Sequence, residues 1–398
     1  MKKTLLIVML LALGLALAAC GGAAEEGLQG KTGDEAMQAG YGRVTRNDDG
    51  SLDVVDLIGR ETLLPADPQR IAAMTGPSYE MVFMLGGADR LIMTKSGHTT
   101  NYPLANLTNP DLEKLETVAA NPSSAVNIEE YLSRGVDMVI YYENDTELKK
   151  FANVGVPAIV LTLNTGLLGT LEEVQAQSLD EYIFNSTIAV NTLAAILGGE
   201  ALDEAAAWTQ YCTDKLTMLA ERTASLSAEE RPTIYWGNTW GENVLASYAL
   251  KNRWYEIMLV GGELLGPATS GGNFPEITRE QLFDWDPDII FVDNHGNYPE
   301  LVIKDMYKEG GEWATLSAVK NQQLHRIPTG VFFIDKGTTT TLMLLWMATL
   351  VQPELFSDID IIAELQYYYQ EFYEYDLSAE EAQRILDGWY TQSEDSAW

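Results

Sequence analysis

The sequence is poor in cysteine, histidine and basic residues, and each scarcity excludes a class of function. Two cysteines among 398 residues, Cys20 and Cys212, leave no room for a disulfide framework. Three histidines, His98, His295 and His325, leave little material for a metal site built from protein side chains alone. With 25 Lys and Arg against 58 Asp and Glu, the formal net charge is −33. Such a charge excludes a protein that binds nucleic acid through a basic surface, and disfavours binding to anionic lipid headgroups.

The sequence also lacks the motifs of common enzyme classes. It has no Gly-x-Ser-x-Gly, His-Glu-x-x-His or Cys-x-x-Cys motif and no phosphate-binding glycine loop. Its many carboxylates would permit a glycosidase pair, but a count of acids says nothing about the distance between two of them. We therefore expect a protein that is not an enzyme and has no intrinsic cofactor. A surface glycan-binding or hydrolytic lipoprotein is the alternative from a different class.

What is present is enough apolar material for a packed protein of about two domains. Apolar residues make up 46% of the chain and charged residues 21%, which is typical of a globular chain. At roughly 150 residues per domain, the length favours two domains.

The N-terminus has the pattern of an export signal. Lys2 and Lys3 precede an apolar run over residues 5–17, which is shorter than the ~20 residues that span a bilayer but suits a signal peptide. Leu17-Ala18-Ala19-Cys20 resembles the lipobox of bacterial lipoproteins, which implies cleavage after residue 19 and a lipid on Cys20. Two acyl chains there would hold the protein stably on a membrane. The alternative is an ordinary secretory signal with an incidental cysteine.

Residues 20–50 are expected to form a flexible tether. The segment is rich in Gly, Ala, Glu, Asp and Gln and shows no apolar periodicity. With Cys20 lipidated, Cys212 has no partner within the chain, and we expect it to be a buried apolar residue.

Past the tether, short apolar runs alternate with helical segments, which indicates βαβ units and a parallel sheet. Residues 52–64 have the pattern of a β-hairpin. In this N-terminal lobe (51–200), strands are expected over 71–74, 91–94, 138–142 and 158–163, and helices over 78–85, 127–133 and 146–154.

Residues 202–226 predict one long helix. The segment is dense in Ala, Leu, Glu, Lys and Met and contains neither Gly nor Pro. Its length of about 36 Å, at ~1.5 Å per residue, would let it bridge two lobes. A bridging segment (201–230) then precedes a C-terminal lobe (231–398). There, strands are expected over 233–236, 289–293 and 324–328, and helices over 254–260, 278–283, 338–350 and 360–387.

Several segments, taken in order, resemble the substrate-binding proteins of ABC importers for siderophores, haem and cobalamin. They are DLIGRETLLP (56–65), PQRI (68–71), NIEEYL (127–132), VDMVI (136–140), GVPAIV (155–160), ITREQL (277–282) and DPDIIF (286–291). The resemblance implies an α/β fold of two Rossmann-like α/β lobes joined by one long bridging helix, with a ligand cleft between the lobes. It also implies an extracytoplasmic, membrane-anchored monomer that delivers its cargo to an ABC importer permease dimer.

Two glutamates occupy equivalent places in the two halves. Glu129 and Glu280 each begin a predicted helix that precedes an Asp-x-x-Ile strand or its close variant. In the family that the chain resembles, one surface glutamate per lobe at this place docks onto arginines of the permease. The alternative is that each glutamate only complements the dipole of its helix.

The candidate ligand-binding residues lie in loops at the carboxyl ends of predicted strands, where open α/β sheets bind ligands. They are Tyr79, His98, Tyr142, Trp236, Trp240, His295 and Phe332. An aromatic-lined site suits a large, partly apolar ligand. The aromatic residues could equally serve as packing, and His98 and His295 could be either axial metal ligands or hydrogen-bonded structural residues.

The ligand implied by the resemblance is a metal chelate of the iron-siderophore type, with a corrinoid or haem as the alternative. A bare metal ion would need all three histidines to converge, yet His325 begins a predicted strand far from the loops. Arg253 is the only arginine near a loop of the second lobe. This scarcity favours a neutral or cationic chelate over a highly anionic one.

Overall fold

The N-terminal part of the chain begins with a small antiparallel sheet. The computed structural model describes residues 40–120, 125–163, 170–239, 243–267, 274–293, 298–335 and 337–390. Strands β1 (Val44–Arg46), β2 (Leu52–Val55) and β3 (Glu61–Leu64) pair in that order, which confirms the predicted hairpin. The expectations for Cys20, the tether up to residue 39, Trp240 and His295 lie outside the described residues.

A buried carboxylate fixes the turn of this hairpin and joins it to the main sheet. Oδ1 of Asp56 accepts hydrogen bonds from the backbone amides of Ile58 (3.1 Å) and Arg60 (2.9 Å). Oδ2 accepts one from the amide of Val160 at 3.1 Å. The DLIGRE segment therefore ties a turn to the residue that follows β8, 104 positions further along the chain.

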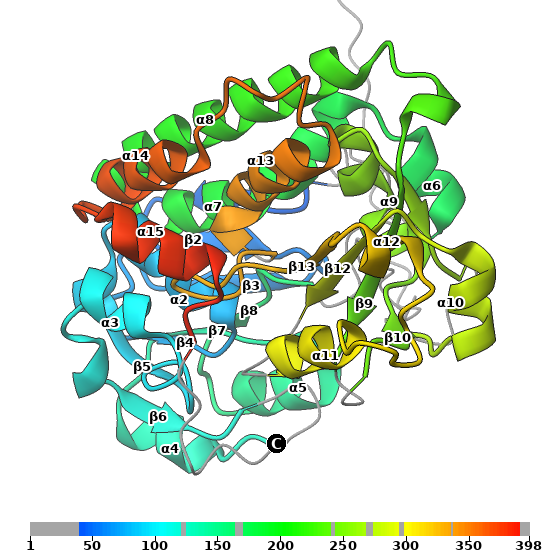
Figure 1. Ribbon diagram of the computed structural model, residues 1–398. Helices are drawn as coiled ribbons and strands as arrows, with labels where there is room; N and C mark the ends of the chain where they lie inside the picture. The colour runs from blue at the N-terminus through cyan, green and yellow to red at the C-terminus, as the bar shows by residue number, and fades with distance from the viewer. Residues whose placement is uncertain are drawn as a thin grey trace, which may run out of the picture.

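The N-terminal lobe is built on a five-stranded parallel sheet with strand order β6-β5-β4-β7-β8. Its strands are β4 (Ile71–Ala73), β5 (Leu91–Lys95), β6 (Glu116–Val118), β7 (Met138–Ile140) and β8 (Ala158–Ile159). The connecting helices are α2 (Gly76–Met84), η1 (Ala88–Arg90), α3 (Pro103–Thr108), η2 (Leu112–Lys114), α4 (Ile128–Ser133) and α5 (Asp145–Asn153). The strands and helices expected in this lobe are present, with bounds that differ from the predicted ones by a few residues (Figure 1).

The C-terminal lobe has a second sheet, in which β9 pairs with β10, β11 and β12, and β12 pairs with β13. The strands are β9 (Thr233–Asn238), β10 (Ala246–Ser247), β11 (Glu263–Leu265), β12 (Ile289–Asp293) and β13 (Leu324–Arg326). The helices are η3 (Ala228–Glu230), α9 (Leu250–Leu259), α10 (Arg279–Trp285), α11 (Tyr298–Met306), α12 (Ser317–Lys320), η4 (Gly337–Thr339), α13 (Thr340–Val351), α14 (Ile361–Tyr373) and α15 (Ala379–Leu386). Only β10 runs antiparallel, and the other pairings are parallel.

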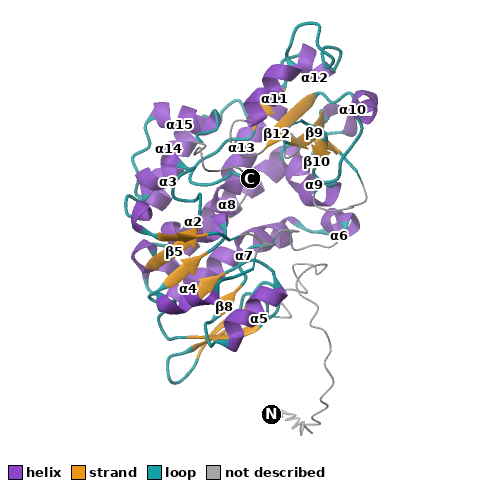
Figure 2. Cartoon of the chain, turned by 90° about the horizontal axis from the view of Figure 1, so that it is seen from below, coloured by secondary structure: helices purple, strands orange, loops and turns teal. Residues whose placement is uncertain are grey.

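Two long helices run between the two sheets, whereas the sequence pattern predicted only one of them. The expected long helix is α8 (Glu200–Thr223); α7 (Leu179–Leu197) packs along it after the short α6 (Leu171–Ala176) (Figure 2). Near the start of α7, Tyr182 stacks on Tyr255 of α9, with ring centroids 4.6 Å apart. At its other end, the carbonyl of Leu197 accepts a hydrogen bond from Arg90 of the first lobe. The lobes are therefore joined by an antiparallel helix pair.

The two lobes begin with the same hydrogen-bonding device. The carboxylate of Asp137, just before β7, accepts a bond from the backbone amide of Arg70 at 2.9 Å, just before β4. The carboxylate of Asp288, just before β12, accepts one from the amide of Thr233 at 2.8 Å, where β9 begins. Each aspartate satisfies an amide at the start of the first strand of its sheet, which explains the repeated Asp-x-x-Ile pattern physically.

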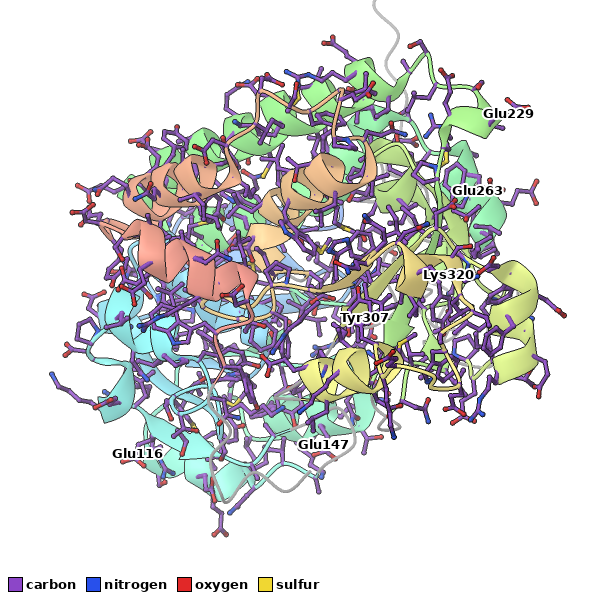
Figure 3. All side chains as sticks on the ribbon, in the orientation of Figure 1. Glu116, Glu147, Glu229, Glu263, Tyr307 and Lys320 are labelled. Atoms are coloured by element: carbon purple, nitrogen blue, oxygen red, sulfur yellow. The ribbon has the colours of Figure 1, made fainter. Side chains whose placement is uncertain are left out.

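The acidic residues that dominate the composition lie mainly on the outside. Glu116, Glu229 and Glu263 are exposed and lie at the outer edge of the molecule in Figure 3. By contrast, α13 is buried along most of its length between the second sheet and the other helices. Within the described residues, no helix combines the length and apolar character needed to cross a membrane.

Candidate ligand-binding site

The first lobe contributes helix α2, whose start follows the carboxyl end of β4. The Thr75 side chain caps the helix by accepting a hydrogen bond from the amide of Ser78. One residue further on, Tyr79 is fully buried, and its hydroxyl donates to the carbonyl of Val331 at 2.6 Å. Val331 belongs to segment 327–335, which follows β13 of the second lobe. The predicted site residue Tyr79 thus holds a segment from the opposite lobe.

Phe332 of the same segment stands directly over Gly76. A Cβ atom at Gly76 would lie 2.1 Å from Cζ of Phe332, so no larger residue fits beneath this ring. The ring also contacts Tyr102, with centroids 5.2 Å apart, and His98, at 5.7 Å. The structure therefore brings together three predicted residues, Tyr79, His98 and Phe332.

His98 is buried, and its hydrogen bonds define its tautomer. Its Nδ1 lies 3.1 Å from Oγ1 of Thr94, and that hydroxyl donates its single hydrogen to the carbonyl of Ala73 at 2.9 Å. Nδ1 of His98 must therefore be the donor, and Nε2 carries a lone pair. Burial, and then the charge of Lys95, lower the pKa of His98, which favours the neutral imidazole.

Two buried tyrosines keep their hydroxyls unpaired. Neither Tyr102 nor the predicted Tyr142 forms a hydrogen bond through its hydroxyl within the part of the chain that the structure describes, although both are at least nine-tenths buried. Burial, and then the neighbouring phenols of Tyr79 and Tyr390, raise the pKa of Tyr102. Sequence reasoning missed Tyr102, although the following Pro103 marks the start of α3 next to a candidate loop.

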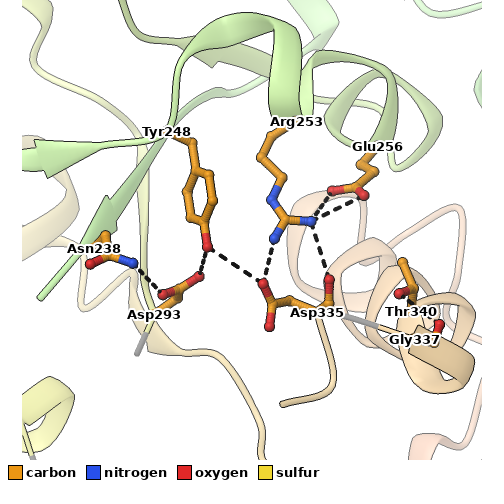
Figure 4. A network of polar contacts seen from close by, with 8 residues as sticks. All are labelled: Asn238, Tyr248, Arg253, Glu256, Asp293, Asp335, Gly337 and Thr340. Carbon is orange, nitrogen blue, oxygen red and sulfur yellow. Dashed lines mark hydrogen bonds and ion pairs between the residues drawn. The ribbon is translucent and has the colours of Figure 1, made fainter. Parts of the chain in front are cut away.

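The second lobe contributes a polar network at the carboxyl ends of β9 and β12 (Figure 4). Asp293, the last residue of β12, accepts a hydrogen bond from Nδ2 of Asn238 at 2.9 Å on one oxygen. Its other oxygen accepts one from the hydroxyl of Tyr248 at 2.5 Å. The same hydroxyl lies 3.5 Å from Oδ2 of Asp335. Tyr248 therefore connects the end of the sheet to segment 327–335.

Arg253 on α9 completes this network. Its guanidinium pairs with Oδ2 of Asp335 and donates to Glu256 at 2.9 and 3.1 Å (Figure 4). It also lies over the ring of Trp236, at 4.5 Å, and over that of Tyr248, at 4.6 Å. Although burial acts to lower it, the pKa of Arg253 is raised by the charge of Glu256 and, further, of Asp335.

Within the described residues, the guanidinium of Arg253 pairs with two carboxylates, those of Glu256 and Asp335. The carboxylate of Asp293 joins the network through Tyr248. Oδ1 of Asp335 accepts no hydrogen bond from the described residues, although its side chain is only 4% exposed. The predicted contact Trp236 is fully buried and reaches the network through Arg253. Tyr248, Asp293 and Asp335 were missed by sequence reasoning, whereas Arg253 was noted for its rarity.

The two predicted docking glutamates are equivalent in structure. Glu129 lies in the first turn of α4 and Glu280 in the first turn of α10, each eight residues before the aspartate that anchors its sheet. Both side chains are exposed, and neither forms a hydrogen bond or ion pair across the described ranges. Their role in docking stays a prediction.

Comparison with known proteins assigns the chain to a family. The model of the periplasmic binding protein family matches residues 71–329, more than half of the chain. This chain belongs to the periplasmic binding protein family. Members of this family are the substrate-binding proteins of ABC transporters and not enzymes, so the chain acts outside the cytoplasm with a small-molecule ligand and a permease partner. The predicted two-lobe α/β fold is confirmed.

Individual relatives are distant. Over 275 residues, 66% of this chain and 74% of the relative, the chain is 24% identical to the molybdate-binding protein MolA of Haemophilus influenzae. The molybdate-bound structure of MolA superposes with a TM-score of 0.67 at 19% identity, covering 84% of this chain and 99% of MolA. A periplasmic solute binding protein of Veillonella parvula superposes with a TM-score of 0.66 at 25% sequence identity, and the match covers 84% of this chain and 96% of that protein. A Ni-His complex of CeuE from Helicobacter pylori superposes with a TM-score of 0.64 at 19% identity, covering 84% of this chain and 99% of CeuE.

Proposed function

We propose that this protein captures a metal chelate of the iron-siderophore type between its two lobes and delivers it to the permease dimer of an ABC importer. A corrinoid or haem is the alternative cargo. The observation that carries the proposal is the set of unpaired polar atoms on buried side chains of both lobes: Nε2 of His98, the hydroxyls of Tyr102 and Tyr142, and Oδ1 of Asp335. A small-molecule site typically combines apolar surface with a few polar groups that remain available to the ligand.

The aromatic rings beside these atoms support a sizeable, partly apolar ligand. Phe332 is only partly buried, and its ring meets those of Tyr79, His98 and Tyr102. Such rings provide apolar area around a few directional polar groups, the usual composition of a small-molecule site. In this arrangement each lobe provides one wall of the ligand site, the first from residues 51–200 and the second from residues 231–398, and residues 201–230 join the lobes. One chain is enough to form both walls, so we propose that the protein is a monomer.

A tetrahedral oxyanion is the second candidate, because the relative MolA is named for molybdate. Charge favours the chelate over the oxyanion. Arg253 is already paired with Glu256 and Asp335, and an anion that displaced them would leave two buried carboxylates without a countercharge. Uncompensated buried charge of that kind costs several kcal/mol.

Ligand titrations test this proposal. Purified protein is titrated with a cationic ferric trihydroxamate, a trianionic ferric tris-catecholate, haemin, aquacobalamin and molybdate, and binding is followed by tryptophan fluorescence and equilibrium dialysis. We expect stoichiometric binding of at least one neutral or cationic chelate and none of molybdate. Binding of molybdate alone would contradict the chelate assignment.

We also propose that Cys20 carries a lipid that anchors the protein to a membrane. The protein would then lie on the outer face of the cell membrane or in the periplasm. The Leu17-Ala18-Ala19-Cys20 pattern supports this proposal. The sequence has one other cysteine, Cys212. Cys212 is buried, and its thiol accepts a hydrogen bond from Thr341 at 3.3 Å.

Replacing Cys20 with serine is expected to move the protein from the membrane fraction into the soluble fraction, because the lipid acceptor is lost. Immunoblots of fractionated cells measure this change. Cys212→Ser is the matched control and should stay with the membrane. Membrane retention of the Cys20→Ser protein would contradict the anchor.

A further inference from the structure

Residues 387–390, the last that the structure describes, form a strap that runs from α15 toward the first lobe (Figure 1). Just before the strap, the carbonyl of Ile385 accepts a hydrogen bond from the backbone amide of Thr329 at 3.0 Å. Within it, Gly388 lies so close to Arg326 that a Cβ atom there would be 2.2 Å from Nε of the guanidinium. The strap therefore leaves the second lobe at a fixed place, next to the end of β13.

The far end of the strap contacts the first lobe through Tyr390. Its hydroxyl accepts a hydrogen bond from Nδ2 of Asn101 at 2.9 Å, and the side chain of Asn101 is buried. Asn101 also closes a tight loop, because its backbone amide donates to the carbonyl of Gly97 at 3.0 Å. Gly97 has φ 90°, which favours glycine, and a Cβ atom there would lie 3.2 Å from Nδ2 of Asn101. Tyr390 thus satisfies a buried donor in loop 96–102, which links β5 to α3.

The ring of Tyr390 also holds Tyr102, the last residue of this loop. The two rings meet edge-on, with centroids 5.4 Å apart and an interplanar angle of 84°. Phe332 and Phe333 contact the ring of Tyr102 as well, at 5.2 and 5.5 Å. Three aromatic rings from the second lobe therefore orient Tyr102, whose buried hydroxyl forms no hydrogen bond within the described ranges.

Covering of apolar surface by a chain end accounts for only part of these contacts. It would explain the ring of Tyr390 against Tyr102, but not the hydrogen bond between its hydroxyl and a buried amide. Loop 96–102 has neither a strand nor a helix of its own, so its shape depends on turn hydrogen bonds and on contacts from outside. Without the hydroxyl of Tyr390, the amide of Asn101 would lose this acceptor in a buried place, which is unfavourable.

We propose that Tyr390 is a positioning residue, which holds loop 96–102 and the hydroxyl of Tyr102 in place for the ligand. This inference rests on the proposed function and extends the ligand site to the C-terminal strap. Tyr390 acts through Asn101 and Tyr102 rather than by touching the ligand. A loop that is already ordered loses less freedom when the ligand binds, so the strap raises affinity.

Tyr390→Phe is the variant that removes the hydroxyl and keeps the ring. It leaves Asn101 without this acceptor, so we expect the backbone amides of residues 97–102 to exchange with deuterium about tenfold faster in the ligand-free protein. Exchange is measured on peptides by mass spectrometry. Tyr375→Phe is the matched control, because it removes a hydrogen bond of 2.8 Å to Glu381 that lies within the second lobe. The control should leave exchange in the loop unchanged.

Ligand affinity shows whether Tyr390 acts through the hydroxyl of Tyr102. Binding of the cationic ferric trihydroxamate, haemin and aquacobalamin is measured for the wild-type protein, Tyr390→Phe, Tyr102→Phe and the double variant. We expect Tyr390→Phe to weaken binding of the chelate that the wild-type protein binds by about tenfold. Once the hydroxyl of Tyr102 is absent, Tyr390→Phe should have little further effect. A merely structural role would weaken binding equally in both backgrounds.

The outcomes separate this inference from the proposed function. Unchanged exchange of residues 97–102 in Tyr390→Phe, or equal weakening with and without the hydroxyl of Tyr102, overturns the inference, while chelate binding by the wild-type protein still supports the proposed function. Unchanged affinity of Tyr390→Phe has the same meaning. If the wild-type protein binds none of the three chelates, both fail.

Discussion

Replacing both Glu129 and Glu280 with arginine is expected to abolish uptake of the ligand while leaving its affinity for the purified protein unchanged. Both carboxylates are exposed on the first turns of equivalent helices, without partners in the described residues, so reversing their charge disturbs nothing inside either lobe. Against arginines of a permease, two reversed charges would turn two attractions into repulsions, each costing several kcal/mol at a close interface.

This double variant is measured by growth or by accumulation of labelled ligand in cells that depend on the importer, beside a binding titration of the purified protein. A matched control reverses Glu200 and Glu229, which are equally exposed but lie at the start of α8 and in η3, away from α4 and α10. The control should transport normally. Normal transport by the Glu129→Arg, Glu280→Arg protein, or an equal loss in the control, would remove these residues from the docking surface.

Replacing Arg253 with methionine is expected to lower the free energy of unfolding by about 3–5 kcal/mol. The change keeps an apolar stem over Trp236 but leaves Glu256 and Asp335 buried without their shared cation. Denaturant unfolding of purified protein measures the loss. Arg279→Met provides the control, because Arg279 and Glu312 form a half-exposed pair, whose removal costs about 0–1 kcal/mol.

The pH dependence identifies uncompensated charge as the cause. Burial already raises the pKa of Glu256, and Arg253 acts to lower it, so without the guanidinium the folded-state pKa lies further above that of the unfolded chain. A carboxyl with a raised folded-state pKa favours folding at low pH, and this contribution is lost as the pH rises through that pKa. The deficit of Arg253→Met should therefore be larger at about pH 8 than at about pH 5.

A triple variant provides the complementary check. Adding Glu256→Gln and Asp335→Asn to Arg253→Met removes the uncompensated charges and should restore much of the lost stability. A pH-independent deficit, or no recovery in the triple variant, would show that packing over Trp236 rather than charge accounts for the effect.

The sequence predicted most strands and helices because their signals are local. Apolar runs and turn residues located β4, β5, β7, β9 and β12 to within a few residues. Helix α7 was missed because its apolar residues do not form a simple stripe: it packs against both lobes and α8. The tail, expected as one helical stretch, divides into α14 and α15, with Glu374 in the left-handed region at φ 51°.

The site was only partly predictable. Loop position and residue type identified Tyr79, His98 and Phe332, which do come together. Asp335, Tyr248 and Tyr102 carry no motif, and their meaning depends on contacts between segments that lie far apart in the chain. The lone pair on Nε2 of His98 depends on where the hydroxyl of Thr94 points, which only the folded sheet decides.

By itself the sequence determined the class of this protein: an acidic, cysteine-poor, two-lobed α/β binding protein with an export signal pattern. The acidity, the α/β halves and the export pattern follow from composition, periodicity and segment order, which are properties of the chain read locally. The binding role was implied by the resemblance of those segments to a known family. The tertiary structure decided which polar groups stay unpaired and which are neutralised. Pairing of that kind is a matter of three-dimensional distance, as when segment 327–335 brings Asp335 to Arg253 while its Val331 is held by Tyr79 of the other lobe.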